Sequence, residues 1–429
     1  MAGMRPLFRK LVLSTLEPLA SGRLELELPD GGVLRYGGLA GRPVARVRVS
    51  DENFFRRCVL FGPIGFAESH IAGEWDSPDL AAVIAFFLRN AADSPALEKP
   101  GGKKAPFLDI VSAYNRFLHR RRPNSLRISR RNISDHYDLS NDFFRLWLDP
   151  TMTYSSAYFD PAGLPLEEAQ RKKYDVLCRK LGLSSADHVL EIGTGWGGFS
   201  IHAATHFGCR VTTTTISREQ LEEARARIAA AGLADRVQVL FEDYRNLTGR
   251  FDKIASIEMI EAVGDAFIDG YFERCSHLLK PHGLLGIQGI LCPDQQYEVL
   301  RRGVDFIQKH IFPGSLLMSA QRLLQASSRT PALNLYNYED MGPHYARTLH
   351  MWLENFDTCL PEVRKLGFDD RFVRKWRYYL AYCEAAFAMR HITVAQLVFT
   401  KTGNLSLNAG SPVDGLDYAA ARPGSSTLT

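Results

Sequence analysis

Alternating apolar and polar positions mark the first hundred residues as a small domain that contains β-strands. The stretch RLELELPDGGVLRYGG alternates around an Asp-Gly-Gly turn at residues 30–32, which is typical of a β-hairpin. VARVRVS alternates again at residues 44–50, and residues 80–88 have the apolar spacing of a helix. We therefore expect an N-terminal α/β or β-rich domain over residues 1–105.

Strand and helix patterns alternate beyond a segment rich in Pro, Gly and Lys at residues 95–106. Strands are expected at residues 188–192, 210–216, 237–241, 253–257 and 284–290, and helices at 197–207, 218–231 and 266–279. This order predicts a doubly wound parallel α/β sheet that binds ligands at the carboxyl ends of its strands.

The C-terminal third is expected to complete this domain. Residues 293–343 are interpreted as an insertion before the sheet resumes, residues 345–390 as two helical stretches, and residues 394–399 as a late strand. Residues 404–429 contain mostly Gly, Ser, Ala and Pro with few large apolar groups, so a disordered tail is expected there.

Composition limits the class of protein. The chain has 429 residues, of which 45% are hydrophobic and 23% charged, as in soluble proteins of two or three domains. It has no apolar run of about 18 residues, so no membrane span is expected. The seven cysteines are scattered without a C-x-x-C motif, which favours a reducing, cytoplasmic location and no cysteine-based metal site.

The net charge of +4 is unevenly distributed. Residues 116–131, RFLHRRRPNSLRISRR, contain seven arginines and no acid, with apolar residues interleaved. One interpretation is a solvated basic linker over residues 106–132. The other is a contact with an anionic surface, and we prefer a membrane to nucleic acid because no recognition module accompanies the patch.

The most informative motif is VLEIGTGWGG at residues 189–198, in which an apolar strand runs into closely spaced glycines. Glycine is needed where a chain turns sharply from strand to helix and where the backbone contacts a ligand. A dinucleotide fingerprint fits poorly, because the third glycine comes one residue early and the next strand ends in threonines. Glu191, Gly193, Gly195 and Gly197 instead form the E-x-G-x-G-x-G pattern of class I S-adenosylmethionine (SAM) methyltransferases. A glycine-rich turn without a ligand is the structural alternative.

Further segments resemble the cyclopropane-fatty-acyl-phospholipid synthase family, which includes mycolic acid methyltransferases and plant cyclopropane synthases. They are HYDLSNDFFRLWLDPTMTYSSAYF (136–159), TISREQ (215–220), DYRNL (243–247), IEMIEAVG (257–264), IQKHIFPG (307–314) and LGFDDRFVRKWRYYLAYC (366–383). The resemblance implies a Rossmann-like methyltransferase domain over residues 133–403, with a seven-stranded doubly wound sheet. It also implies that the smaller N-terminal domain lies on the lipid side.

The reaction implied by this resemblance adds the methyl carbon of SAM to a cis double bond in an unsaturated phospholipid acyl chain. Attack by the alkene leaves a carbocation, and a bound bicarbonate ion then takes a proton so that a cyclopropane forms. The enzyme would work at the cytoplasmic membrane face, and relatives of this kind often form homodimers. A water-free, aromatic site would protect the cation. The candidates are Phe143, Phe144, Tyr158, Phe159, Trp352, Tyr378, Tyr379 and Tyr382.

Eleven residues are implied as SAM contacts: Tyr154, Ser155, Glu191, Gly193, Thr194, Gly195, Gly197, Thr215, Gln220, Asp243 and Tyr244. Some of them have ordinary structural alternatives. Thr215 could be a strand residue without contact to a ligand, Gln220 a helix-surface amide, and Asp243 the cap of a turn.

The implied bicarbonate site departs from the better-known pattern of the family. Glu261, Tyr345 and Ile290 match it, whereas Ser156 stands in place of a cysteine and Gln288 in place of a histidine. Both side chains can donate a hydrogen bond, so an anion is still expected to bind. Glu261 could instead be a carboxylate at the start of a helix.

Two other outcomes stay open. The same methyl transfer could end in a methylene- or methyl-branched chain. If the anion binds loosely, a hydride shift and loss of another proton would give the methylene branch. A non-catalytic lipid-binding protein with the same fold is the alternative of another class, and the intact glycine loop and Glu261 argue against it. His136 and Asp138 fit no metal-site template and are interpreted as residues of a substrate-side loop.

Overall fold

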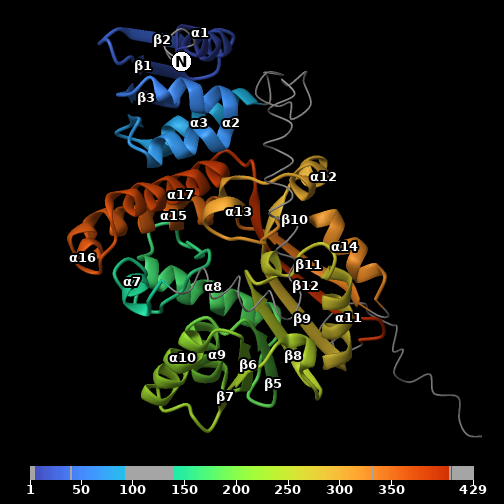
Figure 1. Cartoon of the computed structure of the whole chain (residues 1–429). Helices are drawn as coiled ribbons and strands as arrows, with labels where there is room; N and C mark the ends of the chain where they lie inside the picture. The colour runs from blue at the N-terminus through green and yellow to red at the C-terminus, as the bar shows by residue number, and fades with distance from the viewer. Residues whose placement is uncertain (1–4, 39–40, 92–138, 331–332, 405–406, 408–429) are drawn as a thin grey trace, which may run out of the picture.

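The computed structural model describes residues 5–38, 41–91, 139–330, 333–404 and 407 (Figure 1). Several features predicted from the sequence lie outside these residues. They are the linker at 95–106, the basic stretch at 116–131, His136, Asp138 and nearly all of the predicted tail.

The described residues of the N-terminal domain form a four-stranded sheet and three helices. The strand order is β2-β1-β3-β4, and β1 pairs with β2 as the expected antiparallel hairpin. Its elements are α1 (Arg5–Leu16), β1 (Arg23–Glu27), β2 (Val33–Gly37), β3 (Val44–Val49), α2 (Asn53–Ile71), β4 (Trp75–Asp76) and α3 (Leu80–Ala91). Alternate residues of β1 and β3 are buried, as their sequence period predicts. Helix α2 is kinked at Gly62, which has a φ of 56° and is followed by Pro63.

The second domain is built on a sheet with the strand order β11-β12-β9-β8-β5-β6-β7, and β10 pairs with β9 beside this path. Strands β5 to β9 are parallel, and β12 is antiparallel to both of its neighbours. The strands are β5 (His188–Ile192), β6 (Arg210–Thr215), β7 (Val237–Phe241), β8 (Phe251–Ile257), β9 (Leu279–Cys292), β10 (Met318–Ser319), β11 (Leu333–Asp340) and β12 (Thr393–Lys401). The predicted doubly wound α/β sheet is confirmed. Strand β11, which lies within the predicted insertion at 293–343, forms an edge of the sheet.

Helices flank this sheet on both sides, with α9 and α10 on one side and α11 and α14 on the other (Figure 1). The helices and 3-10 turns are α7 (Asn141–Arg145), α8 (Leu166–Lys180), α9 (Gly198–Phe207), α10 (Arg218–Ala230), η2 (Tyr244–Asn246), η3 (Ile260–Ala262), α11 (Ile268–Leu278), α12 (Asp294–Arg302), α13 (Phe306–His310), α14 (Ala320–Ser328), α15 (Gly342–Thr358), α16 (Leu360–Lys365) and α17 (Asp370–Ala388). The region expected to hold two helical stretches contains α15, α16 and α17. Within the described part of the chain, no helix has the length and apolar character needed to cross a membrane.

The two domains are joined through α17, which packs against both α2 and α3. Arg374 of α17 donates hydrogen bonds to the backbone carbonyls of His70 (2.5 Å) and Trp75 (2.7 Å). It also pairs with the carboxylate of Asp76 at 3.0 Å and donates to Nδ1 of His70 at 3.1 Å. Burial, followed by the charge of Arg374, lowers the pKa of His70 to about 4, so this ring is neutral and can accept that bond.

Candidate active site

One continuous cavity of about 2030 Å³ connects the carboxyl ends of the central strands with the interior of the N-terminal domain. At one end it is lined by the glycine turn after β5 and by the residues that follow β6 and β7. At the other end it is lined by apolar residues of α1, α2 and α3. The cavity therefore offers a polar, backbone-rich end and a long apolar end within the same space.

The glycine turn requires glycine for its backbone conformation. Gly193, Gly195 and Gly197 have φ values of 97°, 52° and 88°, in the left-handed region that residues with a side chain rarely adopt. A Cβ on Gly193 would lie 3.3 Å from Cγ of Met259, so its neighbour would have to move. Gly193 and Gly195 line the cavity together with Thr194. Gly197 is the N-cap of α9 and faces α10, and it is not among the lining residues.

Two buried polar pairs support the polar end of the cavity. Thr215, at the end of β6, donates a hydrogen bond of 2.8 Å to Oε1 of Gln220, which leaves the amide hydrogens of Gln220 available to a ligand. Thr194 shares a hydrogen bond of 2.7 Å with Thr213 on the neighbouring strand. Thr215 and Gln220 both line the cavity, so the structure brings these predicted SAM contacts to one place.

Glu191 is a buried carboxylate beneath the glycine turn. Its side chain accepts a hydrogen bond from the hydroxyl of Ser200. Burial raises its pKa to about 7, although this hydrogen bond favours the charged form. Glu191 therefore changes its protonation state near neutral pH. It is one of the residues that line the cavity.

Asp243 and Tyr244 lie at the end of β7 and line the cavity. Asp243 accepts hydrogen bonds from the backbone nitrogen of Arg245 (3.0 Å) and from its guanidinium (2.7 and 2.8 Å). It is therefore the cap of the 3-10 turn η2, as the structural alternative predicts. Its place in the lining is equally consistent with a SAM contact.

The segment before the sheet contributes Tyr154 and Ser155 to the lining. The hydroxyl of Tyr154 shares a hydrogen bond of 2.8 Å with that of Tyr379 on α17. Ser155 accepts a hydrogen bond of 2.6 Å from Nζ of Lys173, a fully buried lysine of α8. Burial lowers the pKa of Lys173 to about 8, whereas the charge of Glu258 favours its protonated form.

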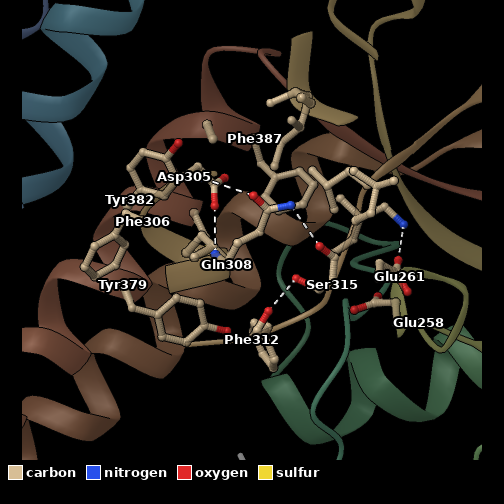
Figure 2. A pocket seen from close by; sticks show the side chains of 18 of the residues that line it. Glu258, Glu261, Asp305, Phe306, Gln308, Phe312, Ser315, Tyr379, Tyr382 and Phe387 are labelled. Atoms are coloured by element: carbon tan, nitrogen blue, oxygen red, sulfur yellow. Dashed lines mark hydrogen bonds between the residues drawn. The ribbon is translucent and has the colours of Figure 1, made fainter. Parts of the chain in front are cut away.

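Glu258, which the sequence interpretation did not single out, contacts three of the predicted catalytic residues. Figure 2 shows it beside a fourth, Glu261. Oε2 of Glu258 accepts a hydrogen bond of 2.7 Å from the hydroxyl of Tyr345. Its Oε1 accepts bonds of 2.8 Å from the backbone nitrogen of Ser156 and of 2.8 Å from Nε2 of Gln288. Burial raises the pKa of Glu258, and the positive charge of Lys173 opposes this shift. The sequence contains a signal for Glu258. Strand β8 ends at residue 257, and an acid directly after a parallel strand lies at the edge of the sheet where ligands bind.

Glu261 lies beside Glu258 at the edge of the cavity (Figure 2). Its Oε1 accepts a hydrogen bond of 2.5 Å from the backbone nitrogen of Ile290, whereas its buried Oε2 has no partner among the described residues. Burial, followed by the charge of Glu258, raises the pKa of Glu261 to about 8. Near neutral pH Glu261 is therefore mostly a neutral acid.

The four groups predicted to hold bicarbonate through donated hydrogen bonds are engaged elsewhere. Tyr345 and the amide of Gln288 donate to Glu258, and the nitrogen of Ile290 donates to Glu261. The hydroxyl of Ser156 donates to the carbonyl of the next residue at 3.0 Å. Ser156 and Gln288 are both fully buried, behind Glu258. Bicarbonate would meet two carboxyl groups in place of free donors, so the residues present do not fit this ion.

Aromatic side chains line the apolar part of the cavity next to the two acids (Figure 2). They are Phe306, Phe312, Tyr378, Tyr379, Tyr382 and Phe387. Of the aromatic candidates from the sequence, Tyr378, Tyr379 and Tyr382 are in this lining. Phe143, Phe144, Tyr158, Phe159 and Trp352 are absent from it and pack in the core or against it.

Comparisons with known proteins agree with this geometry. The family model described as mycolic acid cyclopropane synthetase matches residues 124–397. Tuberculostearic acid methyltransferase UfaA1 of Mycobacterium tuberculosis is 39% identical over 366 residues, which cover 81% of this chain and 81% of that protein. Cyclopropane-fatty-acyl-phospholipid synthase of Escherichia coli K12 is 33% identical over 388 residues, covering 88% of this chain and 96% of that protein.

A solved structure shows the same architecture with its ligands in place. The mycolic acid cyclopropane synthase CmaA1, complexed with S-adenosylhomocysteine (SAH) and CTAB, superposes with a TM-score of 0.60 at 30% identity. The match covers 63% of this chain and 98% of that one. With the glycine turn, the sheet order and these matches together, the chain belongs to the mycolic acid cyclopropane synthetase family of SAM-dependent methyltransferases.

Proposed function

We propose that this protein transfers the methyl carbon of SAM to a cis double bond in an unsaturated phospholipid acyl chain, which then closes to a cyclopropane. The observation that carries the proposal is the continuity of the cavity. Its polar end contains the glycine turn, Thr215 and Gln220, which suit a nucleoside, and its apolar end is long enough to reach the N-terminal domain. A methyl donor and an acyl chain can therefore meet inside one space.

The chemistry demands such a site. An isolated alkene is a weak nucleophile, so the reaction depends on the electron-poor methyl carbon that SAM supplies and on close placement of the two reactants. The cation that follows would react with water to give an alcohol, so water must be excluded. The rings of Phe312, Tyr379 and Tyr382 present apolar, electron-rich surfaces to this part of the cavity and support that requirement.

The phospholipid is proposed to come from a membrane surface on the cytoplasmic side. Helices α1, α2 and α3 supply the apolar end of the cavity, so the N-terminal domain is the side from which an acyl chain would enter. Leu7 and Leu11 on α1 are 51% and 43% exposed, and Leu11 belongs to the cavity lining. The arginine-rich stretch at 116–131 would add attraction to anionic headgroups.

A second product is favoured by one specific comparison. The relative that is 39% identical is named as a tuberculostearic acid methyltransferase and not as a cyclopropane synthase. This name favours a methylene- or methyl-branched chain as the second candidate product of this protein. The methyl transfer itself is the same in both cases. The cyclopropane and the methylene-branched chain differ only in the fate of the cation.

The test is incubation of the protein with SAM and liposomes of a cis-monounsaturated phospholipid, followed by mass spectrometry and NMR of the fatty acids. We expect one added carbon and the NMR signals of a cyclopropane ring. A methylene branch on the chain would establish the second product. Liposome binding without any added carbon would contradict both and indicate a non-catalytic lipid-binding protein.

A further inference from the structure

Glu258 accepts hydrogen bonds from two of the four donor groups that the family resemblance assigns to a bound anion, Tyr345 and Gln288. Tyr345 donates to one carboxylate oxygen, and Ser156 (through its backbone nitrogen) and Gln288 donate to the other. A carboxylate has the same planar pair of oxygens as bicarbonate, so it can satisfy the same donors. The side chain thus completes the site from within the protein.

We propose that the carboxylate of Glu258 is the base that removes the proton from the transferred methyl group, in place of a bound bicarbonate ion. The inference rests on the proposed function and specifies one residue of that site. It differs from the bicarbonate mechanism implied by the family resemblance, with which the occupied donors disagree.

The backbone holds Glu258 where such a base is needed. Its φ is 48°, in the left-handed region, so the chain adopts a costly conformation at the end of β8. Its backbone nitrogen donates a bond of 2.7 Å to the carbonyl of Gln288. The next residue, Met259, lies against Gly193 of the glycine turn. The carboxylate therefore lies at the junction between the nucleoside end and the apolar end of the cavity, which it lines.

A relay of side-chain amides fixes the orientation of the donor opposite Glu258. Nε2 of Gln396 donates to Oε1 of Gln288 at 3.1 Å, so the amide nitrogen of Gln288 must face Glu258. Nζ of Lys180 in turn donates to Oε1 of Gln396 at 2.8 Å. The arrangement presents hydrogens to an acceptor and suits an ionised carboxylate.

The charged groups around Glu258 favour a single negative charge in this buried region. Burial raises the pKa of Glu258, whereas the positive charge of Lys173 and the three donated hydrogen bonds favour its ionised form. Burial, followed by the charge of Glu258, raises the pKa of Glu261 to about 8 and keeps that neighbour mostly neutral near pH 7. A bicarbonate ion would add a second negative charge to the same buried region. Glu258 ionised beside a neutral Glu261 is therefore the division of roles that the geometry favours.

The proposed step balances in atoms and electrons. The π pair of the alkene forms a bond to the methyl carbon as the bond from that carbon to sulfur breaks, and the sulfur keeps its electron pair. The neighbouring alkene carbon becomes a cation. Glu258 then takes a proton from the added methyl group, and the electrons of that C–H bond close the ring. The proton stays on Glu258 until the product leaves and water can accept it.

Glu258 can also act as the base when the methylene-branched chain forms. A hydride shift would move the cation to the carbon that bears the new methyl group, and loss of a proton from that methyl group gives a methylene branch on the chain. In both outcomes the proton comes from the transferred carbon. The inference therefore does not depend on which of the two products forms.

Chemical rescue tests the inference. Glu258→Gly removes the carboxylate and suits the positive φ, and it leaves the three donors facing an empty space. Glu258→Gln is the matched control, because it removes the charge and keeps the space filled. Turnover is measured in buffer freed of carbon dioxide, and then with added sodium formate or bicarbonate. Thermal unfolding and SAH affinity establish that each variant is folded.

We expect wild-type turnover to be unchanged when bicarbonate is removed. Both variants should lose at least about 100-fold in turnover, the contribution typical of a general base. Formate or bicarbonate should restore the Glu258→Gly variant at least tenfold and leave the Glu258→Gln variant inactive. Wild-type turnover that stops without bicarbonate, a fully active Glu258→Gly variant, or a folded Glu258→Gly variant that no anion restores would each overturn the inference.

A binding measurement separates this inference from the proposed function. In ¹³C NMR titrations with labelled formate and bicarbonate, the Glu258→Gly variant should show saturable broadening that is absent from the wild type. If the wild type turns over no unsaturated phospholipid, the proposed function fails, and the titration still decides whether Glu258 fills the anion site. Saturable binding of bicarbonate to the wild type would contradict the inference whatever the activity.

Discussion

The hydroxyl of Tyr345 donates a hydrogen bond of 2.7 Å to Oε2 of Glu258, across 87 positions of sequence. Tyr345 lies on α15, and Glu258 follows β8, so this bond joins α15 to the carboxyl edge of the sheet. Burial, followed by the charge of Glu258, raises the pKa of Tyr345 well above its ordinary value, so the phenol remains a donor. The bond orients a carboxylate that faces the cavity.

Replacing this donor should slow turnover without weakening cofactor binding. In Tyr345→Phe the charged acceptor loses a hydrogen bond worth about 1.5–3 kcal/mol, so we expect kcat to fall about 10- to 100-fold. The affinity for SAM should change less than about twofold, because Thr215 and Gln220 are untouched. Steady-state kinetics and calorimetric titration check both expectations. Tyr336→Phe, at a tyrosine 53% exposed on β11, is the control. Equal activity of the two variants would contradict the role of Tyr345.

Mutation at the polar end of the cavity should weaken the binding of SAM. Gln220→Ala removes the amide that Thr215 orients, and we expect the dissociation constant for SAM to rise about 5- to 10-fold, as for the loss of about 1 kcal/mol. Gln295→Ala on α12, which changes an exposed residue in another part of the lining, should leave that constant unchanged. Isothermal titration measures both. A larger effect from Gln295→Ala would place the nucleoside elsewhere.

Glu261 makes stability depend on pH. Its pKa is 4.5 in the absence of the fold and about 8 within it, so the folded protein binds more protons between these values. The free energy of unfolding should therefore fall as pH rises through this window, by up to about 1.4 kcal/mol per pH unit from this group. Urea unfolding of Glu261→Gln should show a shallower decline than the wild type. Identical slopes would show that Glu261 does not titrate in this window.

The contact between the domains should contribute measurably to stability. Arg374→Met leaves the carboxylate of Asp76 and two backbone carbonyls without their partner, and we expect a loss of about 1–3 kcal/mol in the free energy of unfolding. Arg371→Met, at an exposed residue of the same helix, should have little effect. Denaturant unfolding compares the two variants. If they are equally stable, the Arg374 contacts do not hold the domains together.

Local sequence rules predicted much of the fold. The alternation of β1, β2 and β3 and the strand-helix order from β5 to β9 follow from periods that need no distant partner. The three glycines of the turn after β5 were identifiable because their positive φ values are a local backbone requirement. The glycine turn at the polar end of the cavity was therefore predictable before the tertiary structure.

The acid site was less predictable because it depends on distant contacts. Glu258 and Glu261 stand three residues apart in the same motif, and only the packing of Ser156, Gln288 and Tyr345 decides which of them receives the donors. The hydroxyl of Ser156 also faces a neighbouring carbonyl rather than the cavity, which its residue type could not reveal. Strand β11 was missed for a related reason. Its residues are mostly exposed at the edge of the sheet, so they lack a buried apolar pattern.

On this proposal, a nucleoside and an acyl chain occupy one cavity on either side of Glu258. A crystal structure with SAH and a cis-monounsaturated phospholipid would decide this. We predict the nucleoside against Gly193, Gly195 and Gln220, and the acyl chain running past Phe312 toward α2. A nucleoside bound away from the glycine turn, or an acyl chain bound only outside the cavity, would contradict the account.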